Sequence, residues 1–218
     1  MLTIACVLKS GGDYDWEYVN RLKKNIDENI THEYKFVIFT DMWESKQCPP
    51  EGVEIRYLES EFKTYWSKLE LFRLTGEVLY FDLDTIILNG LDFLIEGIRT
   101  MVSFHPEKDH FFMMKAFNRH RRYASGILAW NGDFEWLYSS TKPEMIERYG
   151  KWEQDYIVDR LCSVKQKINF IDDCMGGGII SYKHHCIAGI PKSANIICFH
   201  GKPRPREVNW LEEVLIGK

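Results

Sequence analysis

The chain has 218 residues, enough to bury a substantial core, and we expect one domain over residues 1–218. Hydrophobic residues make up 45% of it, charged residues 28%, and the formal net charge is -4. This balance gives no general attraction to polyanions, so a nucleic acid partner is not favoured. No stretch approaches the ~20 apolar residues that cross a bilayer, and no basic segment precedes the first apolar run. We therefore expect no membrane span and a cytoplasmic location.

Apolar residues alternate between strand and helix spacing along the first half of the chain. Strands are predicted at 2–8, 34–40, 53–58 and 78–88, and helices at 14–27, capped by Asp13, and at 65–74. In the second half, strands are predicted at 101–105, 125–130 and 194–200, a helix at 152–162, and a glycine-rich turn at 175–178. This order is typical of an α/β fold in which helices flank a mostly parallel central sheet. No linker or shift in composition divides the chain.

The six cysteines form no CxxC pair of the kind that holds zinc. They are Cys6, Cys48, Cys162, Cys174, Cys186 and Cys198. Two of them lie within predicted strands, where a reduced cysteine behaves as a small apolar residue. We expect free thiols throughout.

Two aspartates interrupt the apolar run VLYFDLDTIIL at residues 78–88. Because residues i and i+2 of a strand point to the same side, we expect Asp82 and Asp84 to lie together, with Leu83 facing away. Two buried carboxylates repel each other unless a cation lies between them. Carboxylate oxygens favour Mg²⁺ or Mn²⁺, so both residues are predicted metal ligands. In the alternative interpretation, the strand ends before Asp82 and both carboxylates face solvent in a turn.

The position of the pair is typical of a ligand site, because open α/β sheets bind ligands outside the carboxyl ends of their strands. A D-x-D by itself is also found in phosphohydrolases of the haloacid dehalogenase type, which use D-x-D-x-[TV] after their first strand. Here Ile86 takes the fifth position, and the motif does not follow the first strand. Sugar nucleotidyltransferases carry a glycine-rich phosphate loop near the start, and KSGGDY at 9–14 lacks that pattern. A metal-dependent phosphohydrolase built around Asp82 stays an alternative.

Several segments, in order along the chain, resemble sugar-nucleotide-dependent enzymes of the glycosyltransferase-A fold, especially glycosyltransferase family 8. That family includes glycogenin and bacterial galactosyl- and glucosyltransferases. The segments are FTD at 39–41, YFDLDTIIL at 80–88, SGILAWN at 125–131, WEQD at 152–155 and FHGKPRP at 199–205. Glu153 replaces the first aspartate of the family's DQD, and the last segment is tighter than the family's pattern, which indicates a distant member. The resemblance implies a Rossmann-like nucleotide-binding half, about residues 1–90, and a sugar and acceptor half, about 91–218.

The resemblance also implies roles for individual residues. His200 becomes a third ligand of a manganese or magnesium ion, beside Asp82 and Asp84, although a histidine followed by Gly-Lys-Pro is also compatible with a plain turn. Gly201 and Lys202 correspond to the glycine and lysine that contact the donor's diphosphate. The full set expected to contact a UDP-sugar or other nucleotide-sugar is Leu8, Lys9, Ser10, Tyr14, Asp41, Lys68, Leu83, Ser125, Gly126, Gly201 and Lys202.

The predicted reaction transfers the sugar from this donor to the hydroxyl of an unidentified acceptor. The metal and Lys202 would stabilise the charge of the leaving nucleoside diphosphate. Gln154 and Asp155 are expected near the sugar. An inverting reaction needs a general base, for which Asp155 and Glu153 are candidates, whereas in a retaining reaction the phosphate itself takes the proton. A glycosyltransferase fold that binds nucleotide-sugars without turnover is the third alternative.

Some of these side chains also have structural interpretations. Tyr14 either stacks on the nucleobase or makes the first apolar contact of its helix. Lys68 is either a donor contact or a surface lysine, and Asp155 either lies near the sugar or caps its own helix. A basic cluster, Lys115, Arg119, Arg121 and Arg122, is either a solvated face or a contact for an anionic acceptor.

Overall fold

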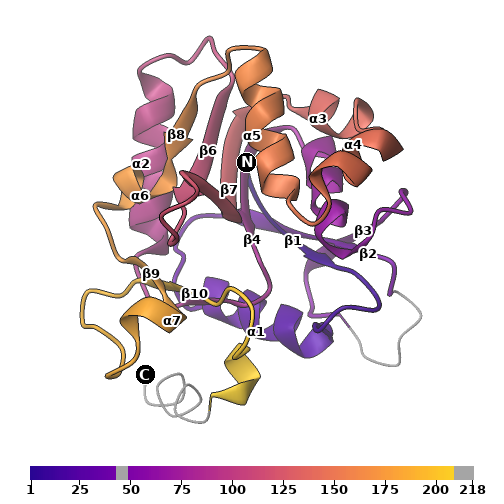
Figure 1. The fold of residues 1–218 in the computed structure, drawn as a ribbon. Coiled ribbons are helices and arrows are strands. Elements are labelled where there is room, and N and C mark those ends of the chain that lie inside the picture. Colours follow the sequence, from indigo (N-terminus) through magenta and orange to yellow (C-terminus); the bar gives the residue numbers. More distant parts are fainter. Residues whose placement is uncertain (43–48, 209–218) are drawn as a thin grey trace.

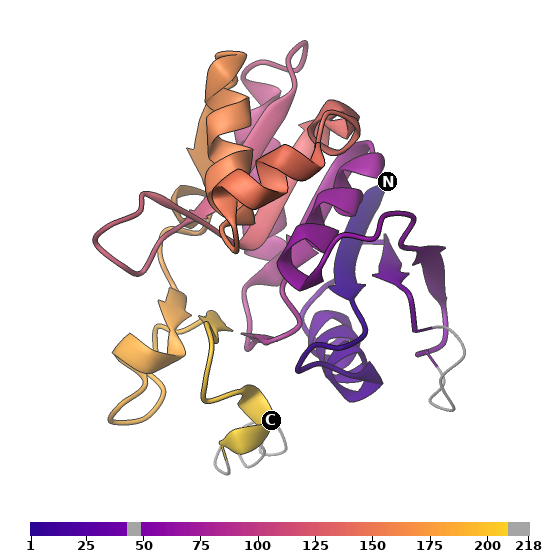
Figure 2. The same ribbon diagram turned by 45° about the vertical axis from the view of Figure 1, so that its right-hand side comes forward.

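The computed structural model of the chain describes residues 1–42 and 49–208. These residues form a seven-stranded sheet of order β3-β2-β1-β4-β7-β6-β8 (Figures 1 and 2). Its strands are β1 (Leu2–Leu8), β2 (Tyr34–Thr40), β3 (Val53–Tyr57), β4 (Gly76–Phe81), β6 (His110–Lys115), β7 (Tyr123–Gly132) and β8 (Ile168–Phe170). Only β7 is antiparallel to its neighbours, β4 and β6, and the other pairings are parallel. The predicted α/β class with a mostly parallel central sheet is confirmed, in a single domain.

Helices cover both faces of the sheet (Figure 1). One layer consists of α1 (Trp16–Asp27), α2 (Leu91–Ser103) and α6 (Ile171–Met175), and the other of η1 (Thr64–Arg73), α3 (Glu135–Ser139), α4 (Pro143–Tyr149) and α5 (Glu153–Ser163). Alternation along β1 supplies both cores, because Ile4 and Cys6 pack in the first layer and Ala5 packs in the second. No helix in the described part of the chain has the length and apolar character that crossing a bilayer requires.

A second, three-stranded sheet lies at the carboxyl end of β4. Its order is β5-β10-β9, from β5 (Thr85–Ile87), β10 (Ile196–Cys198) and β9 (Ile179–Ser181), followed by α7 (Tyr182–His185) after β9 and η2 (Pro205–Glu207) after β10. It has its own small core, in which Ile86, Ile197 and Phe199 are buried. Since β10 pairs with β5 directly after the D-x-D segment, the C-terminal residues 199–208 are brought next to that segment.

The predicted strand at 78–88 is wrong in its middle. It divides into β4 and β5, which belong to different sheets, and Asp82 to Asp84 form the turn between them, closed by a 3.0 Å hydrogen bond from Thr85 N to Asp82 O. The apolar run resumes after Asp84 because all three residues of β5 are buried in the second sheet. The alternative interpretation is therefore right that the strand ends before Asp82.

Three smaller predictions also need correction. The segment 101–105 is not a strand, because α2 runs through Ser103, and 64–73 is a 3₁₀ rather than an α-helix. The cap of α1 is Asp15, which accepts from Glu17 N at 3.1 Å, and not Asp13. The strands at 2–8 and 34–40 have their predicted bounds. The described cysteines are free thiols as predicted, and Cys48 lies outside the described residues.

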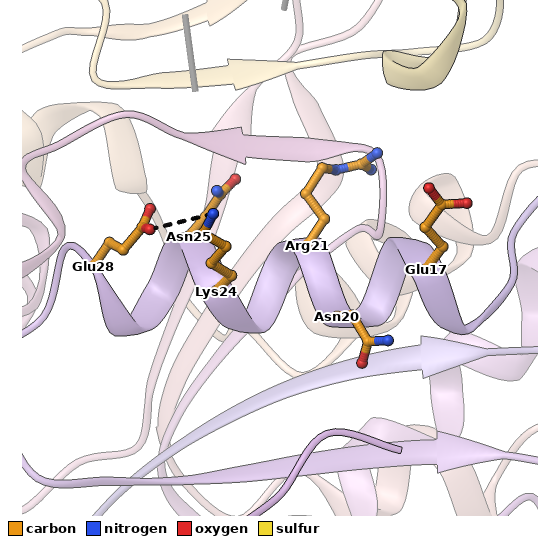
Figure 3. A pocket seen from close by; sticks show the side chains of 6 residues that line it. All are labelled: Glu17, Asn20, Arg21, Lys24, Asn25 and Glu28. Atoms are coloured by element: carbon orange, nitrogen blue, oxygen red, sulfur yellow. Dashed lines mark ion pairs between the residues drawn. The ribbon is translucent and has the colours of Figure 1, made fainter. Parts of the chain in front are cut away.

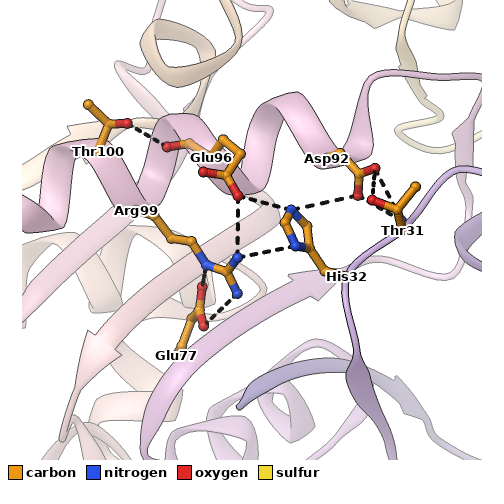
Figure 4. Close-up of polar contacts among 7 residues, drawn as sticks. All are labelled: Thr31, His32, Glu77, Asp92, Glu96, Arg99 and Thr100. Atoms are coloured by element: carbon orange, nitrogen blue, oxygen red, sulfur yellow. Dashed lines mark hydrogen bonds and ion pairs between the residues drawn. The ribbon is translucent and has the colours of Figure 1, made fainter.

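A polar network fastens α2 to the amino end of β4 (Figure 4). Arg99 of α2 donates to both carboxylate oxygens of Glu77 at 2.6 and 3.2 Å, and His32 lies 3.0 Å from Glu96. Asp92, at the start of α2, accepts from the backbone and hydroxyl of Thr31. The network lies at the opposite end of β4 from Asp82, so it orients α2 without entering the D-x-D region.

We expect Gly97→Ala to destabilise the protein, because a Cβ at this position of α2 would lie 2.2 Å from the carbonyl oxygen of Cys174 in α6. The expected loss in the free energy of unfolding is about 1–3 kcal/mol, as in other overpacked cores, even though alanine favours a helix. Urea unfolding monitored by tryptophan fluorescence measures it. Gly12→Ala is the control, since a Cβ there meets only Lys9 O at 3.5 Å. Equal stability of the two variants would contradict the close contact of α2 and α6.

Candidate functional site

The sheet order places the ends of β1 and β4 side by side. Strand β2 follows β1 on one side, and β4 pairs with β1 on the other, so the connections leave this point in opposite directions. Ligands of open α/β sheets bind at such switch points, outside the carboxyl ends of the strands. The loop after β1 and the turn after β4 indeed touch, because Tyr14 OH donates to Asp84 Oδ2 at 2.7 Å.

Asp84 is a buried carboxylate, with 4% of the residue exposed. Besides Tyr14, Arg204 Nη1 donates to its Oδ2 at 2.6 Å. Burial, and then the negative charge of Asp82, raise the pKa of Asp84 to about 7, although the hydrogen bond from Tyr14 and the positive charges of Arg204 and Lys68 lower it. The two aspartates therefore interact electrostatically, as the sequence predicts, but each has a positive side chain of the protein beside it.

Asp82 is the more accessible partner, with 33% of its side chain exposed. Its Oδ1 accepts from Tyr80 OH and lies 3.0 Å from Lys68 Nζ. Its Oδ2 lies 3.6 Å from the position that a Cβ on Gly126 would take. The backbone of Asp82 also donates to Gly126 O at 2.9 Å, so the predicted donor residue Gly126 borders this carboxylate.

Lys68 is buried at the centre of this region, so its interpretation as a surface lysine is wrong. Its Nζ donates to Ser125 O at 3.0 Å and Oγ at 3.1 Å, and lies 3.3 Å from Glu153 Oε1. Burial alone would lower the pKa of Lys68, but Asp82 and Glu153 outweigh it and raise the pKa. Lys68 therefore joins η1, β7, α5 and the D-x-D turn through one charged group.

The three candidate catalytic residues differ in their surroundings. Glu153 is buried and accepts from Ser125 Oγ at 2.6 Å besides pairing with Lys68, so its carboxylate is occupied. Gln154 lies half-buried in the first turn of α5. Asp155 accepts from Arg121 Nε and Nη2 at 3.0 to 3.2 Å. Asp155 is thus paired with the 116–122 loop between β6 and β7 rather than with its own helix.

Arg121 is one of the basic cluster predicted from the sequence, and it also lies 3.9 Å over the ring of Trp152. Lys115 is paired with Asp173 at 2.6 Å. Arg119 and Arg122 are exposed. The cluster is therefore partly neutralised by the protein itself, and its contact with an anionic acceptor stays a prediction.

The loop after β1 is fixed to the end of β2 through Asp41. Lys9 Nζ and Ser10 Oγ each lie 2.7 Å from Asp41 Oδ2, and Ser10 N donates to Oδ1 at 2.8 Å. These three predicted donor residues therefore lie together, directly after the buried Leu8. The Tyr14 ring meets Tyr18 edge-on at 5.0 Å, as expected of an apolar contact of its helix, while its hydroxyl points to Asp84.

The polar partner of His200 in this structure is Ser181. Its Nε2 lies 2.6 Å from Ser181 Oγ, and its ring stacks on Phe117 at 5.5 Å and His184 at 5.6 Å. Partial burial, with Lys183 and His184 nearby, lowers the pKa of His200. Within residues 1–42 and 49–208, no three His, Cys, Asp or Glu side chains are grouped as metal ligands. The role of His200 as a third ligand therefore stays a prediction.

The residues that follow His200 lie at the surface. Gly201 has a φ of 84°, which favours glycine, and a Cβ there would lie 3.2 Å from Lys183 Nζ. The Lys202 side chain is 75% exposed and lies 3.4 Å from Glu207. Leu83, between the two aspartates, is buried, and its carbonyl accepts from Arg21 Nη2 at 3.1 Å.

No protein-family model matches this sequence, and no curated protein matches it. Solved structures do match in fold. The glycosyltransferase GlyE of Streptococcus pneumoniae TIGR4 has a TM-score of 0.58 at 14% identity, over 99% of this chain and 62% of that of GlyE. The galactosyltransferase LgtC, in complex with donor and acceptor sugar analogs, has a TM-score of 0.60 at 12% identity, over 98% of this chain and 94% of that of LgtC. An active-site mutant of LgtC gives 0.59 at 11% identity.

This chain has the glycosyltransferase-A fold. It spans less than two thirds of GlyE but nearly all of LgtC. The resemblance found in the sequence is thus confirmed at the level of the fold.

The resemblance implies a divalent cation at the D-x-D, and the chemistry of Asp82 and Asp84 is compatible with binding one. Both are hard oxygen ligands, and Oδ2 of Asp82 borders Gly126, where a Cβ would lie 3.6 Å from this oxygen and 3.2 Å from Met114 Sδ. The contacts of Asp82 with Lys68 and Tyr80 fall on the other oxygen. The lowered pKa of His200 favours its neutral form, which can bind a metal ion, but in this structure its Nε2 contacts Ser181 Oγ.

Sequence reasoning missed Arg204, the side chain that pairs with Asp84. It stands in the segment FHGKPRP, where attention fell on His200, Gly201 and Lys202. The available signal was that a second buried carboxylate needs a second positive charge, and the chain has an arginine at the end of this segment.

A separate hollow of about 270 Å³ lies along α1 (Figure 3). Its lining is Glu17, Asn20, Arg21, Lys24, Asn25 and Glu28, none of which is a predicted site residue. Lys24 and Glu28 are paired across it at 3.7 Å. Of these residues, Arg21 also donates to Leu83 O between the two aspartates.

Proposed function

We propose that this protein is a glycosyltransferase that moves a sugar from a nucleotide-sugar donor, UDP-sugar first among them, to an acceptor hydroxyl. The observation that carries the proposal is the position of Asp82 and Asp84. They follow β4 at the switch point of a glycosyltransferase-A fold, facing the loop after β1. The printed name of LgtC, a galactosyltransferase bound to donor and acceptor sugar analogs, supports the same class of substrates.

In this proposal Asp82 and Asp84 hold a Mn²⁺ or Mg²⁺ ion. When bound, such an ion supplies Lewis-acid stabilisation to the leaving diphosphate. Lys202 is exposed and lies between β10 and η2, in the segment that also carries Arg204, and we assign it to the diphosphate. As a point charge it would stabilise the negative charge that develops there.

The loop after β1 is assigned to the nucleoside. Lys9, Ser10 and Asp41 form a fixed polar corner in which backbone and side-chain donors face one carboxylate. Such a corner suits the hydroxyls and amide groups of a ribose and a base. The Tyr14 ring lies at the edge of the same loop.

The sugar half is assigned to Ser125, Gly126 and the start of α5. Both Asp155, which pairs with Arg121, and Glu153, which pairs with Lys68, have a positive partner, but the side chain of Asp155 is 40% exposed and that of Glu153 only 7%. For an inverting reaction, Asp155 is therefore the better base, and Glu153 acts by positioning Lys68. In a retaining reaction, the proton of the acceptor passes to the leaving phosphate.

The test is to incubate the purified chain with UDP-glucose, UDP-galactose and GDP-mannose, with Mn²⁺ or with EDTA. We expect release of a nucleoside diphosphate from one donor with Mn²⁺ and its loss with EDTA. Release of phosphate from p-nitrophenyl phosphate, without release from any donor, would instead favour the phosphohydrolase. Binding of UDP with no release over a long incubation would favour a binding module.

A further inference from the structure

Arg204 connects the C-terminal part of the chain to the D-x-D turn. Its Nη1 donates to Asp84 Oδ2 at 2.6 Å and to Tyr14 OH at 2.5 Å, and its Nη2 donates to Asp13 Oδ2 at 3.0 Å. The guanidinium also lies 4.8 Å over the ring of Tyr14. The pair is enclosed, since 15% of the Arg204 side chain and 6% of the Asp84 side chain are exposed.

The segment that carries Arg204 is fastened independently of this side chain. Arg206 pairs with Asp15 at 3.2 Å and lies 5.4 Å from the Tyr18 ring. Pro205 is buried, and the backbone N–H of Arg204 donates to Glu207 at 2.7 Å. The segment 204–207 therefore stays against the start of α1 even when the guanidinium is removed.

A buried carboxylate beside a second one needs a counter-charge, because an unpaired charge in this environment is costly. Arg204 provides it for Asp84, as Lys68 does for Asp82. A divalent cation bound to Asp84 would bring a second positive charge to the carboxylate that Arg204 already holds. The two cations therefore oppose each other, and one weakens the binding of the other.

We propose that Arg204 is a positioning residue that holds Asp84 when no divalent cation is bound and competes with that cation for it. The inference rests on the proposed function, since the cation in question is the one assigned to the donor site. It adds a form of regulation to that site, because the cation binds only when it displaces or outweighs the positive charge of Arg204.

The test measures Mn²⁺ alone, without donor, from the electron paramagnetic resonance signal of the free ion. We expect Arg204→Gln to bind Mn²⁺ about tenfold more tightly than the unmodified protein, the size of effect that removing one nearby charge produces. Arg204→Lys keeps the charge and should bind as the unmodified protein does. Arg206→Gln is the matched control and should leave the affinity unchanged, and Asp84→Asn should weaken binding in either background.

Equal or weaker Mn²⁺ binding by Arg204→Gln would overturn the inference, as would the absence of any Asp84-dependent binding. A measurement on the unmodified protein guards against a variant that does not fold. The NMR signal of Arg204 Nε–Hε, identified by its absence in Arg204→Lys, should shift when Mg²⁺ is added, and an unchanged signal would also overturn it. Donor hydrolysis by the unmodified protein tests the proposed function separately, so hydrolysis without competition would refute this inference alone.

Discussion

Asp82→Asn is expected to lower the release of nucleoside diphosphate from the donor by at least about 100-fold, the typical cost of removing one electrostatic group from a catalytic site. The asparagine keeps the size of the side chain, and its amide oxygen still accepts from Tyr80. What it loses is the charge that would hold a divalent cation. The initial rate of UDP release at saturating donor and Mn²⁺ measures the effect.

The control for this substitution is Asp159→Asn, which neutralises an exposed carboxylate of α5 that accepts from Tyr149 at 2.8 Å. It should leave the rate unchanged. Lys68 remains paired with Glu153 in the Asp82 variant, so its thermal unfolding should stay close to that of the unmodified protein. A folded Asp82→Asn with full activity would show that this carboxylate has no part in the reaction.

The pattern of apolar residues predicted the first two strands of the sheet well, because β1 and β2 are buried runs bounded by polar loops. It failed at α2, where Leu91, Leu94, Ile95 and Ile98 form the buried helical face and the next turn, Met101 and Val102, was read as a strand. An apolar run of two or three residues at the end of a helix is too short to show either the helical or the strand periodicity. Its assignment depends on whether the preceding turn continues.

The two aspartates show a different limit of sequence reasoning. The sequence correctly indicates that Asp82 and Asp84 need positive partners, yet it offers several. Lys68 and Arg204 are the positive partners that the chain itself provides, and a metal ion with His200 stays a prediction. These partners arise from tertiary contacts that no local pattern contains, as does Ser181, which lies 2.6 Å from His200 after the second sheet forms.

The largest effect on stability is expected from Lys68→Met, which leaves Glu153 buried without its counter-charge. Side-chain exposures of 9% for Lys68 and 7% for Glu153 place the pair among buried ion pairs, where removing one partner costs about 3–5 kcal/mol. The lysine also donates to Ser125 O, which would lose that donor. Urea unfolding of the variant measures the loss in the free energy of unfolding.

Two further variants separate the charge from the packing. Lys24→Met removes an exposed lysine, 65% accessible and 3.7 Å from Glu28, and should change stability by less than about 0.5 kcal/mol. Lys68→Met combined with Glu153→Gln removes both charges and should recover a large part of the loss, because the cost comes from the unpaired carboxylate. If the double variant is as unstable as Lys68→Met, packing of the lysine stem, and not its charge, holds η1 against α5.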